Sequence, residues 1–179
     1  MILAIGGPPG SGKTTVAERW AAARGYVLVS AGMRFRAMAK ERGTSLEAFG
    51  KAAEADPEID RALDAAVLAE ILSKEASGAS VVVDGRIQGY LLAKQGIPCI
   101  KVLIDAPLAV RAQRIATREG KSVQDAKREI VARERSERVR YRQIYGIDLR
   151  DTRIFDLVLD SGRKTPDEIV AAIAARVGG

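Results

Sequence analysis

The chain has 179 residues, 47% of them hydrophobic, which is enough for a single domain with a substantial core. It contains no apolar run long enough to span a membrane. It also lacks histidine, which excludes Ser/His/Asp and Cys/His catalysis and histidine metal sites. The net charge of +6 favours an anionic partner, but aromatic residues make up only 4%, too few for a platform that stacks single-stranded bases.

The first element in chain order is an apolar, strand-like segment, residues 2–6, followed by the loop GGPPGSGKTT. The loop fits the phosphate-binding pattern GxxxxGK[ST] and precedes a helix-forming segment, which is the context that the motif requires. We expect Gly7, Pro8, Pro9, Gly10, Ser11, Gly12, Lys13, Thr14 and Thr15 to bind ATP. Lys13 then reaches the outer phosphates, and the Thr14 hydroxyl is a ligand for Mg²⁺.

Four further strands are predicted at residues 26–30, 80–84, 99–105 and 155–160, alternating with helices. Their apolar residues occupy both faces, as expected of a parallel sheet covered by helices on both sides. Between the second and third strands, helices are predicted at residues 31–42, 45–54 and 58–75. The pattern predicts an α/β fold with a five-stranded parallel sheet and a helical insertion, about residues 30–78, all in one domain spanning residues 1–179.

Two of the predicted strands end at candidate site residues. Arg36 follows the second strand and is expected to point into the crevice beyond the carboxyl ends of the strands. The third strand ends in VVVDGR, which places Asp84 where it can orient Mg²⁺-bound water and Arg86 where it can meet an acceptor phosphate. The alternative for Asp84 is an ordinary Asp-Gly turn, and for Arg36 an ordinary surface arginine.

Arginines then recur at helical spacing. Arg114 and Arg118 share one helix face, and in RERSERVRYR we expect Arg135, Arg138 and Arg142 to share another. A short connection at residues 120–125 separates the two groups. The interpretation is an arginine lid over phosphates, about residues 114–135; the alternative is a solvated helix face.

Taken together, GGPPGSGKTT, SAGMRFRAMAKERG, DPEIDRALD, VVVDGRIQGYLL, DAPLAVRAQRIATREGKS, RERSERVRYRQIYGID and FDLVLDS resemble the archaeal-type cytidylate kinases, within the nucleoside monophosphate kinase family. The resemblance covers essentially the whole chain. It implies the P-loop kinase fold with a helical NMP-binding insertion and a short arginine-rich lid. It also implies transfer of the ATP γ-phosphoryl group to CMP or dCMP.

The resemblance further implies roles for individual residues. Lys13, Arg86, Arg114, Arg118 and Arg135 are the expected catalytic charges, Arg36 and Arg86 being the clamps on the acceptor phosphate. Ser30, Gln88 and Arg135 are candidate contacts to the base or ribose. Met33, Arg34 and Ile87 depart from patterns common among cytidylate kinases, so contacts to the base cannot be copied from the bacterial branch.

Alternatives remain at this stage: adenylate, shikimate or dephospho-CoA kinase among the enzymes, and an RNA-associated ATPase switch in another class. We expect small-molecule substrates, no stable nucleic-acid partner, no membrane association and a monomer. Cys99 is the only cysteine, so the chain has no intramolecular disulfide. Because the printed sequence starts directly with the first predicted strand, we expect no leader segment and a cytoplasmic location.

Overall fold

The computed structural model describes residues 1–178, apart from the side chains of residues 46 and 47. Its five strands are all parallel and lie in the order β2-β3-β1-β4-β5. They are β1 (Ile2–Gly6), β2 (Val27–Ser30), β3 (Val81–Asp84), β4 (Ile100–Asp105) and β5 (Leu157–Asp160). Every predicted strand is present and ends at the predicted residue, and the last four begin one or two residues later than predicted. The predicted five-stranded parallel sheet is confirmed.

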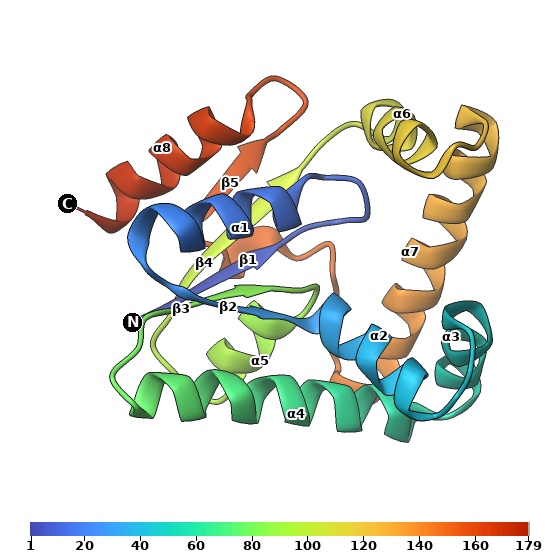
Figure 1. Ribbon diagram of the computed structural model, residues 1–179, viewed down its shortest axis with the longest axis horizontal. Coiled ribbons are helices and arrows are strands. Elements are labelled where there is room, and N and C mark those ends of the chain that lie inside the picture. The colour runs from blue at the N-terminus through green and yellow to red at the C-terminus, as the bar shows by residue number, and fades with distance from the viewer. Residues whose placement is uncertain (179) are drawn as a thin grey trace.

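Helices cover both faces of the sheet (Figure 1). On one face, Leu3 and Ile5 of β1 pack with Trp20 of α1 (Lys13–Arg24) and Ile173 of α8 (Pro166–Val177). On the other face, Ile2 and Ala4 pack with α4 (Pro57–Ala76) and α5 (Gln88–Lys94). Alternate residues of a strand point to opposite faces, so a strand buried on both sides is apolar throughout. These helices leave open the end of the sheet at which the strands have their carboxyl ends.

The predicted insertion consists of α2 (Ala31–Glu41), α3 (Leu46–Ala55) and α4. Each helix begins at a capping side chain: Ser30 accepts from Met33 N, Ser45 from Ala48 N and Asp56 from Glu58 N. Such caps satisfy N–H groups that otherwise lack partners in the first turn. The three predicted helices are present, each bound within one residue of its prediction. In Figure 1, α2 and α3 extend beyond the sheet.

The segment predicted as a lid, about residues 114–135, contains the second half of α6 (Leu108–Glu119), a connection of residues 120–122, and the first half of α7 (Val123–Tyr145). Ala112 and Ile115 of α6 pack with Ala126 and Ile130 of α7 in a small core of their own. The pair stands beside the sheet, and α7 runs from α6 down to the insertion (Figure 1). A short helical segment, η1 (Thr152–Ile154), then leads into β5.

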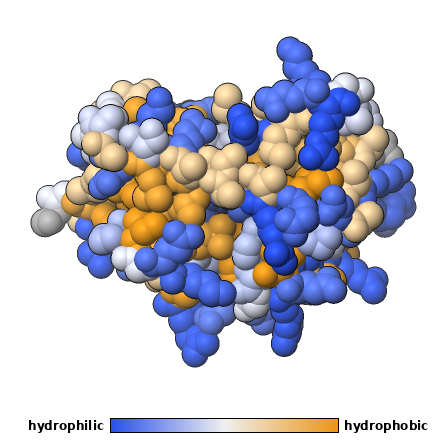
Figure 2. Space-filling model, turned by 90° about the horizontal axis from the view of Figure 1, so that it is seen from below, coloured by the Kyte–Doolittle hydropathy of each residue, from blue (hydrophilic) through white to orange (hydrophobic). Residues whose placement is uncertain are grey.

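The face covered by α4 is seen in Figure 2, where apolar residues gather toward the left and long hydrophilic side chains project mainly from the right half and lower edge. The right half is the side on which the insertion and α7 lie in Figure 1. Within residues 1–178, no helix is long and apolar enough to cross a membrane.

Candidate active site

The loop after β1 is shaped to bind phosphate. Gly12 precedes α1 without a side-chain cap, so the first N–H groups of the helix are left for another acceptor. Gly10 has φ 80°, and a Cβ there would lie 2.8 Å from the carbonyl oxygen of Arg111. A side chain at that position is excluded both by the backbone conformation and by the close approach of α6.

Side chains from outside the loop hold its carbonyl groups. Arg111 donates from Nη1 to Pro9 O at 3.2 Å, and Arg114 donates from Nη1 to the carbonyl oxygens of Gly10 and Ser11, each at 3.4 Å. The Ser161 hydroxyl donates to Ser11 O at 2.6 Å. These contacts fix three successive carbonyl oxygens of the loop. The Ser11 N–H donates to Pro8 O at 3.2 Å, and the N–H groups that follow it at the start of α1 are left to face an anion. The structure thus places Arg114 against the loop itself.

Asp84 lies beside the loop because the ends of β1, β2 and β3 are in register, Asp84 pairing with Ile5 and with Ser30. Its Oδ2 accepts from the Thr14 hydroxyl at 2.8 Å and from the Ser30 hydroxyl at 3.3 Å. Its Oδ1 is buried and has no hydrogen-bond partner among the described residues. A buried carboxylate oxygen without a partner next to a hydroxyl is an arrangement that fits water-mediated binding of Mg²⁺.

Lys13 is partly buried at the first position of α1. Burial lowers its pKa to about 8; Asp84 opposes this shift, and the charges of Arg86 and Arg133 add to it. The lowered pKa shows that the charged form of Lys13 is disfavoured by burial and by the neighbouring cations. A bound polyphosphate would stabilise this charge. The electrostatic surroundings of Lys13 therefore favour an anionic ligand.

Two arginines meet at one buried carboxylate. Glu137 on α7 accepts from Arg86 Nε at 2.5 Å and from Arg133 Nε at 2.8 Å, and its side chain is 5% exposed. Burial alone would raise the pKa of Glu137, but the two guanidinium groups outweigh burial and hold the pKa below its ordinary value. The structure thus brings Arg86 and Arg133 to one carboxylate, and Lys13 lies within electrostatic reach of both arginines.

The other predicted arginines lie elsewhere. Arg36 is exposed on α2, and its Nη1 lies 3.8 Å from where a Cβ on Gly32 would be, as does the Ser30 hydroxyl. It therefore folds back toward the start of its helix. Arg118 is 67% exposed and pairs with its neighbour Glu119 at 2.5 Å.

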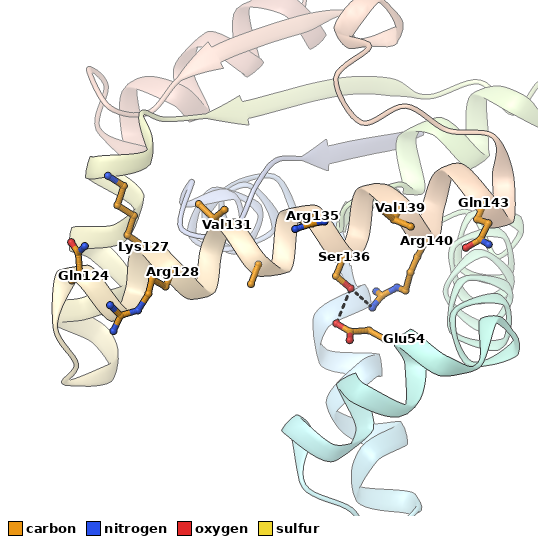
Figure 3. Close-up of a pocket in the computed structure, with 11 residues that line it drawn as sticks. Glu54, Gln124, Lys127, Arg128, Val131, Arg135, Ser136, Val139, Arg140 and Gln143 are labelled. Atoms are coloured by element: carbon orange, nitrogen blue, oxygen red, sulfur yellow. Dashed lines mark hydrogen bonds between the residues drawn. The ribbon is translucent and has the colours of Figure 1, made fainter.

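Arg135 lines a cleft of about 840 Å³ between α7 and Glu54 of α3. At this cleft the Ser136 hydroxyl donates a hydrogen bond to the Glu54 carboxylate at 2.8 Å (Figure 3). Since a helix turns about 100° per residue, Arg135 lies about 200° around α7 from Arg133. The cleft and Arg135 are thus on the face of α7 opposite the one that meets Arg86.

Two residues predicted to contact the substrate have internal partners. Ser30 caps α2 and donates to Asp84. Gln88 is buried, accepting from Arg86 N at 2.9 Å and from Ile87 N at 3.2 Å, and donating to Asp64 Oδ1 at 3.1 Å. Both side chains therefore act on neighbouring site residues in this structure.

Arg133, Glu137 and Arg111 were missed as site residues, although one signal was available for the first two. The buried apolar positions of α7, Ala126, Ile130 and Tyr141, fix its inward face. Arg133 and Glu137 are three and seven residues beyond Ile130, and therefore lie on that face.

Comparison with known proteins places these features in a family. The model of the "Cytidylate kinase-like family" matches residues 2–163. This chain belongs to that family. Cytidylate kinase of Pyrococcus furiosus is 40% identical over 177 residues, covering 99% of this chain and 88% of that protein. Cytidylate kinase of Methanopyrus kandleri is also 40% identical, with 99% and 93% covered. The protein is therefore a kinase; these relatives support a nucleoside monophosphate kinase function with ATP as the phosphate donor.

Solved structures resemble the fold at low sequence identity. An uncharacterized protein from Eubacterium ventriosum has a TM-score of 0.75 at 20% identity, covering 100% of this chain and 99% of that chain. Shikimate kinase from Acinetobacter baumannii, in complex with shikimate, has a TM-score of 0.60 at 18% identity, covering 98% and 94%. These similarities concern the fold alone and confirm the predicted α/β P-loop kinase fold.

Proposed function

We propose that this kinase transfers the γ-phosphoryl group of ATP to CMP and dCMP, releasing ADP and the nucleoside diphosphate. The observation that carries the proposal is the convergence of Lys13, Arg86 and Arg133 beside the phosphate-binding loop. The loop accounts for the donor, and the two arginines, with Arg36 on the insertion, account for an acceptor that carries its own phosphate. The choice of cytosine as the base of the acceptor rests on the archaeal relatives, which are named cytidylate kinases.

The chemistry requires positioning and neutralisation more than covalent catalysis. The transferred group spreads negative charge over its oxygens, and two anionic nucleotides must be held in line. Lys13 neutralises the outer phosphates of ATP, while Arg86 and Arg133 hold the acceptor phosphate. Arg114 keeps the loop in shape through its carbonyl groups. Arg118 and Arg135 remain proposed lid charges, which require α6 and α7 to move if they are to reach phosphate.

Thr14 and Asp84 are the residues that would hold Mg²⁺, the hydroxyl directly and the carboxylate through water. The unpartnered Oδ1 of Asp84 supports this assignment. When bound, the ion neutralises charge on the phosphates of ATP. Ser30 keeps the Asp84 carboxylate oriented by donating to its Oδ2.

Closure is the role proposed for the segments at residues 30–78 and 114–135. Closing them over the bound nucleotides would exclude water that otherwise competes with the acceptor for the phosphoryl group. A monomeric state and a cytoplasmic location remain predictions.

Acceptor selectivity tests the proposal most directly. Purines are larger than a pocket shaped for a pyrimidine. Uracil is of similar size but presents a carbonyl and an N–H where cytosine presents an amino group and a bare ring nitrogen, which would leave buried polar groups unpaired. A few kcal/mol of this kind corresponds to roughly tenfold to several hundredfold discrimination.

The experiment is a coupled assay of ADP production with ATP and a panel of acceptors: CMP, dCMP, UMP, AMP, GMP, shikimate and dephospho-CoA, with RNA added separately. CMP and dCMP should have the highest kcat/KM. A higher kcat/KM for AMP or shikimate than for CMP would show that the acceptor is a different molecule, and the kinase assignment would stay in place. ATP hydrolysis stimulated by RNA and by no small acceptor would contradict the proposal altogether.

A further inference from the structure

A chain of buried hydrogen bonds connects Arg86 to two distant helices. The side chain of Gln88, at the first position of α5, turns back so that Oε1 accepts from both Arg86 N and Ile87 N. Its Nε2 donates to Asp64 on α4. A single amide thus holds two N–H groups of the turn that carries Arg86 and is itself held by a carboxylate of the insertion.

Asp64 is held in turn from α7. Its Oδ2 accepts from the Tyr145 hydroxyl at 2.9 Å, and the residue is only 4% exposed. One turn earlier on α4, Asp60 is paired with Arg140 of α7, Oδ2 to Nε at 2.9 Å. The Arg86 turn, the insertion and α7 therefore meet at the carboxylate of Asp64.

Gly85 gives independent evidence that the Gln88 amide shapes this turn. Its φ lies outside the range that favours glycine, so its backbone conformation does not explain the residue. A Cβ at Gly85 would lie 1.8 Å from Gln88 Oε1, far inside contact distance. A side chain at Gly85 would therefore have to displace the Gln88 amide, whose oxygen fills that space.

We propose that Gln88 and Asp64 are positioning residues: Asp64 fixes the Gln88 amide, and the amide sets the main chain from which Arg86 reaches the acceptor phosphate. This inference rests on the proposed function, because the acceptor is the ligand that Arg86 serves. Both residues act through the main chain of Arg86, because their side chains are hydrogen-bonded to protein groups. Their effect is confined to the acceptor side, since the ATP loop is held separately by Arg111 and Arg114.

The charge of Asp64 adds a pH dependence. Burial raises its pKa to about 7, and the repulsion of Asp60 adds to this, while the hydrogen bonds from Tyr145 and Gln88 and the charge of Arg140 oppose it. Tyr141 on α7 also lies within its electrostatic reach. A proton on Asp64 removes acceptor capacity from a carboxylate that faces two donors. We expect acceptor binding to weaken as the pH falls through about 7.

The first test is Gln88→Met, which keeps the length of the side chain and removes its polar atoms. Steady-state kinetics should show a KM for CMP about tenfold higher, corresponding to unpaired N–H groups in the turn. The KM for ATP should stay within about twofold of the wild-type value. Gln95→Met, an exposed position at the end of the same helix, is the matched control. If Gln88 had a purely structural role, the substitution would change the KM values for CMP and ATP together, or lower the melting temperature, without a selective effect on CMP.

Gln88→Glu gives an outcome that loss of packing cannot imitate. One Glu oxygen still accepts from Arg86 N and Ile87 N, but the other faces the carboxylate of Asp64. The KM for CMP should rise strongly at about pH 8 and recover toward about pH 6, where one proton is shared between the two carboxyl groups. Asp64→Asn should remove the rise in the KM for CMP that the wild type shows as the pH falls. At each pH the KM of the wild type is divided by that of the variant, because titration of CMP itself affects both enzymes equally and cancels in this ratio.

Gly85→Ala completes a double-mutant cycle. Alone it should raise the KM for CMP, because its Cβ displaces the amide. In the Gln88→Met background it should add clearly less, since the amide that the Cβ would displace is already gone and the flexible Met side chain can move aside. Wild-type CMP kinetics in well-folded Gln88→Met, or fully additive effects in the cycle, would overturn the positioning role. Absence of CMP turnover in the wild type would instead overturn the proposed function.

Discussion

Arg86 and Glu137 are 51 residues apart in the chain, and the Nε of Arg86 donates to the Glu137 carboxylate at 2.5 Å. The same carboxylate accepts from Arg133, so one buried anion separates two arginines that are proposed to hold the acceptor phosphate. Without it, two guanidinium groups and Lys13 would repel one another with no anion between them. The carboxylate therefore stabilises the empty enzyme and holds both arginines where we propose that the acceptor phosphate binds.

Replacing Glu137 with Gln should lower the free energy of unfolding by about 3–5 kcal/mol, because partners of a buried ion pair are left uncompensated. The pKa of Glu137 is lowered, so its contribution is fully present above its ordinary pKa of 4.5 and is lost as the pH falls through the folded-state value. Urea unfolding at about pH 7 measures the effect. Glu129→Gln, an exposed carboxylate paired with Lys121, is the control and should cost at most about 1 kcal/mol. Equal effects of the two changes would contradict the buried role of Glu137.

Lys13→Met should lower kcat by a factor of about 10² to 10³, the range found when one group that stabilises the transition state is removed. The melting temperature should not fall, since the lowered pKa means that burial of the charge disfavours the empty folded state. Single-turnover kinetics and thermal unfolding on the same preparation measure both. A variant with more than about a tenth of wild-type kcat would show that Lys13 lies outside the transition-state contacts.

Arg36→Ala should raise the KM for CMP and lower kcat, with little effect on ATP, because a mispositioned acceptor loses in-line geometry. Arg34→Ala is a matched control: both side chains are exposed on α2, but they are two residues apart and so point in different directions. Unfolding free energies should change by less than about 0.5 kcal/mol in both variants. A change confined to the KM for ATP would move Arg36 to the donor side.

Much of this architecture could be predicted because local signals agree with the global fold. The five strand ends were predicted correctly since each apolar run stops at a polar or turn residue, such as Ser30 or Asp84. The phosphate-binding loop has its own sequence pattern. The insertion could be predicted from the caps at Ser45 and Asp56, which begin helices irrespective of what they pack against.

The direction in which side chains point on α7 could not be predicted from the arginine spacing alone. Arginine recurs along RERSERVRYR on several faces, and only packing against α6 and α4 decides which face is inward. The roles of Asp60 and Asp64 depend on partners far along the chain, so their burial has no local signal. The same is true of Gln88, whose partner Asp64 is 24 positions earlier.

Arginines on the two faces of α7 are expected to differ in their effect on catalysis. Arg133→Ala should lower kcat by at least about tenfold, because Arg133 lies within electrostatic reach of Lys13 and shares Glu137 with Arg86. Arg135→Ala should have the smaller effect, since Arg135 lines the cleft on the opposite face. The pair is matched in residue type, helix and exposure, and kcat at saturating ATP and CMP compares them. The reverse order would place Arg135 over the phosphates in the closed enzyme.

The pH dependence of ATP use follows from the pKa of Lys13. Because that pKa is lowered to about 8, the free enzyme loses the Lys13 charge as the pH rises through 8, and kcat/KM for ATP should fall over that interval. Bound polyphosphate raises the pKa again, so kcat at saturating ATP should stay level to higher pH. Lys13→Arg provides the control: arginine stays protonated, so activity should be lower but free of this decline. A decline at the same pH in Lys13→Arg would assign the titration to another group.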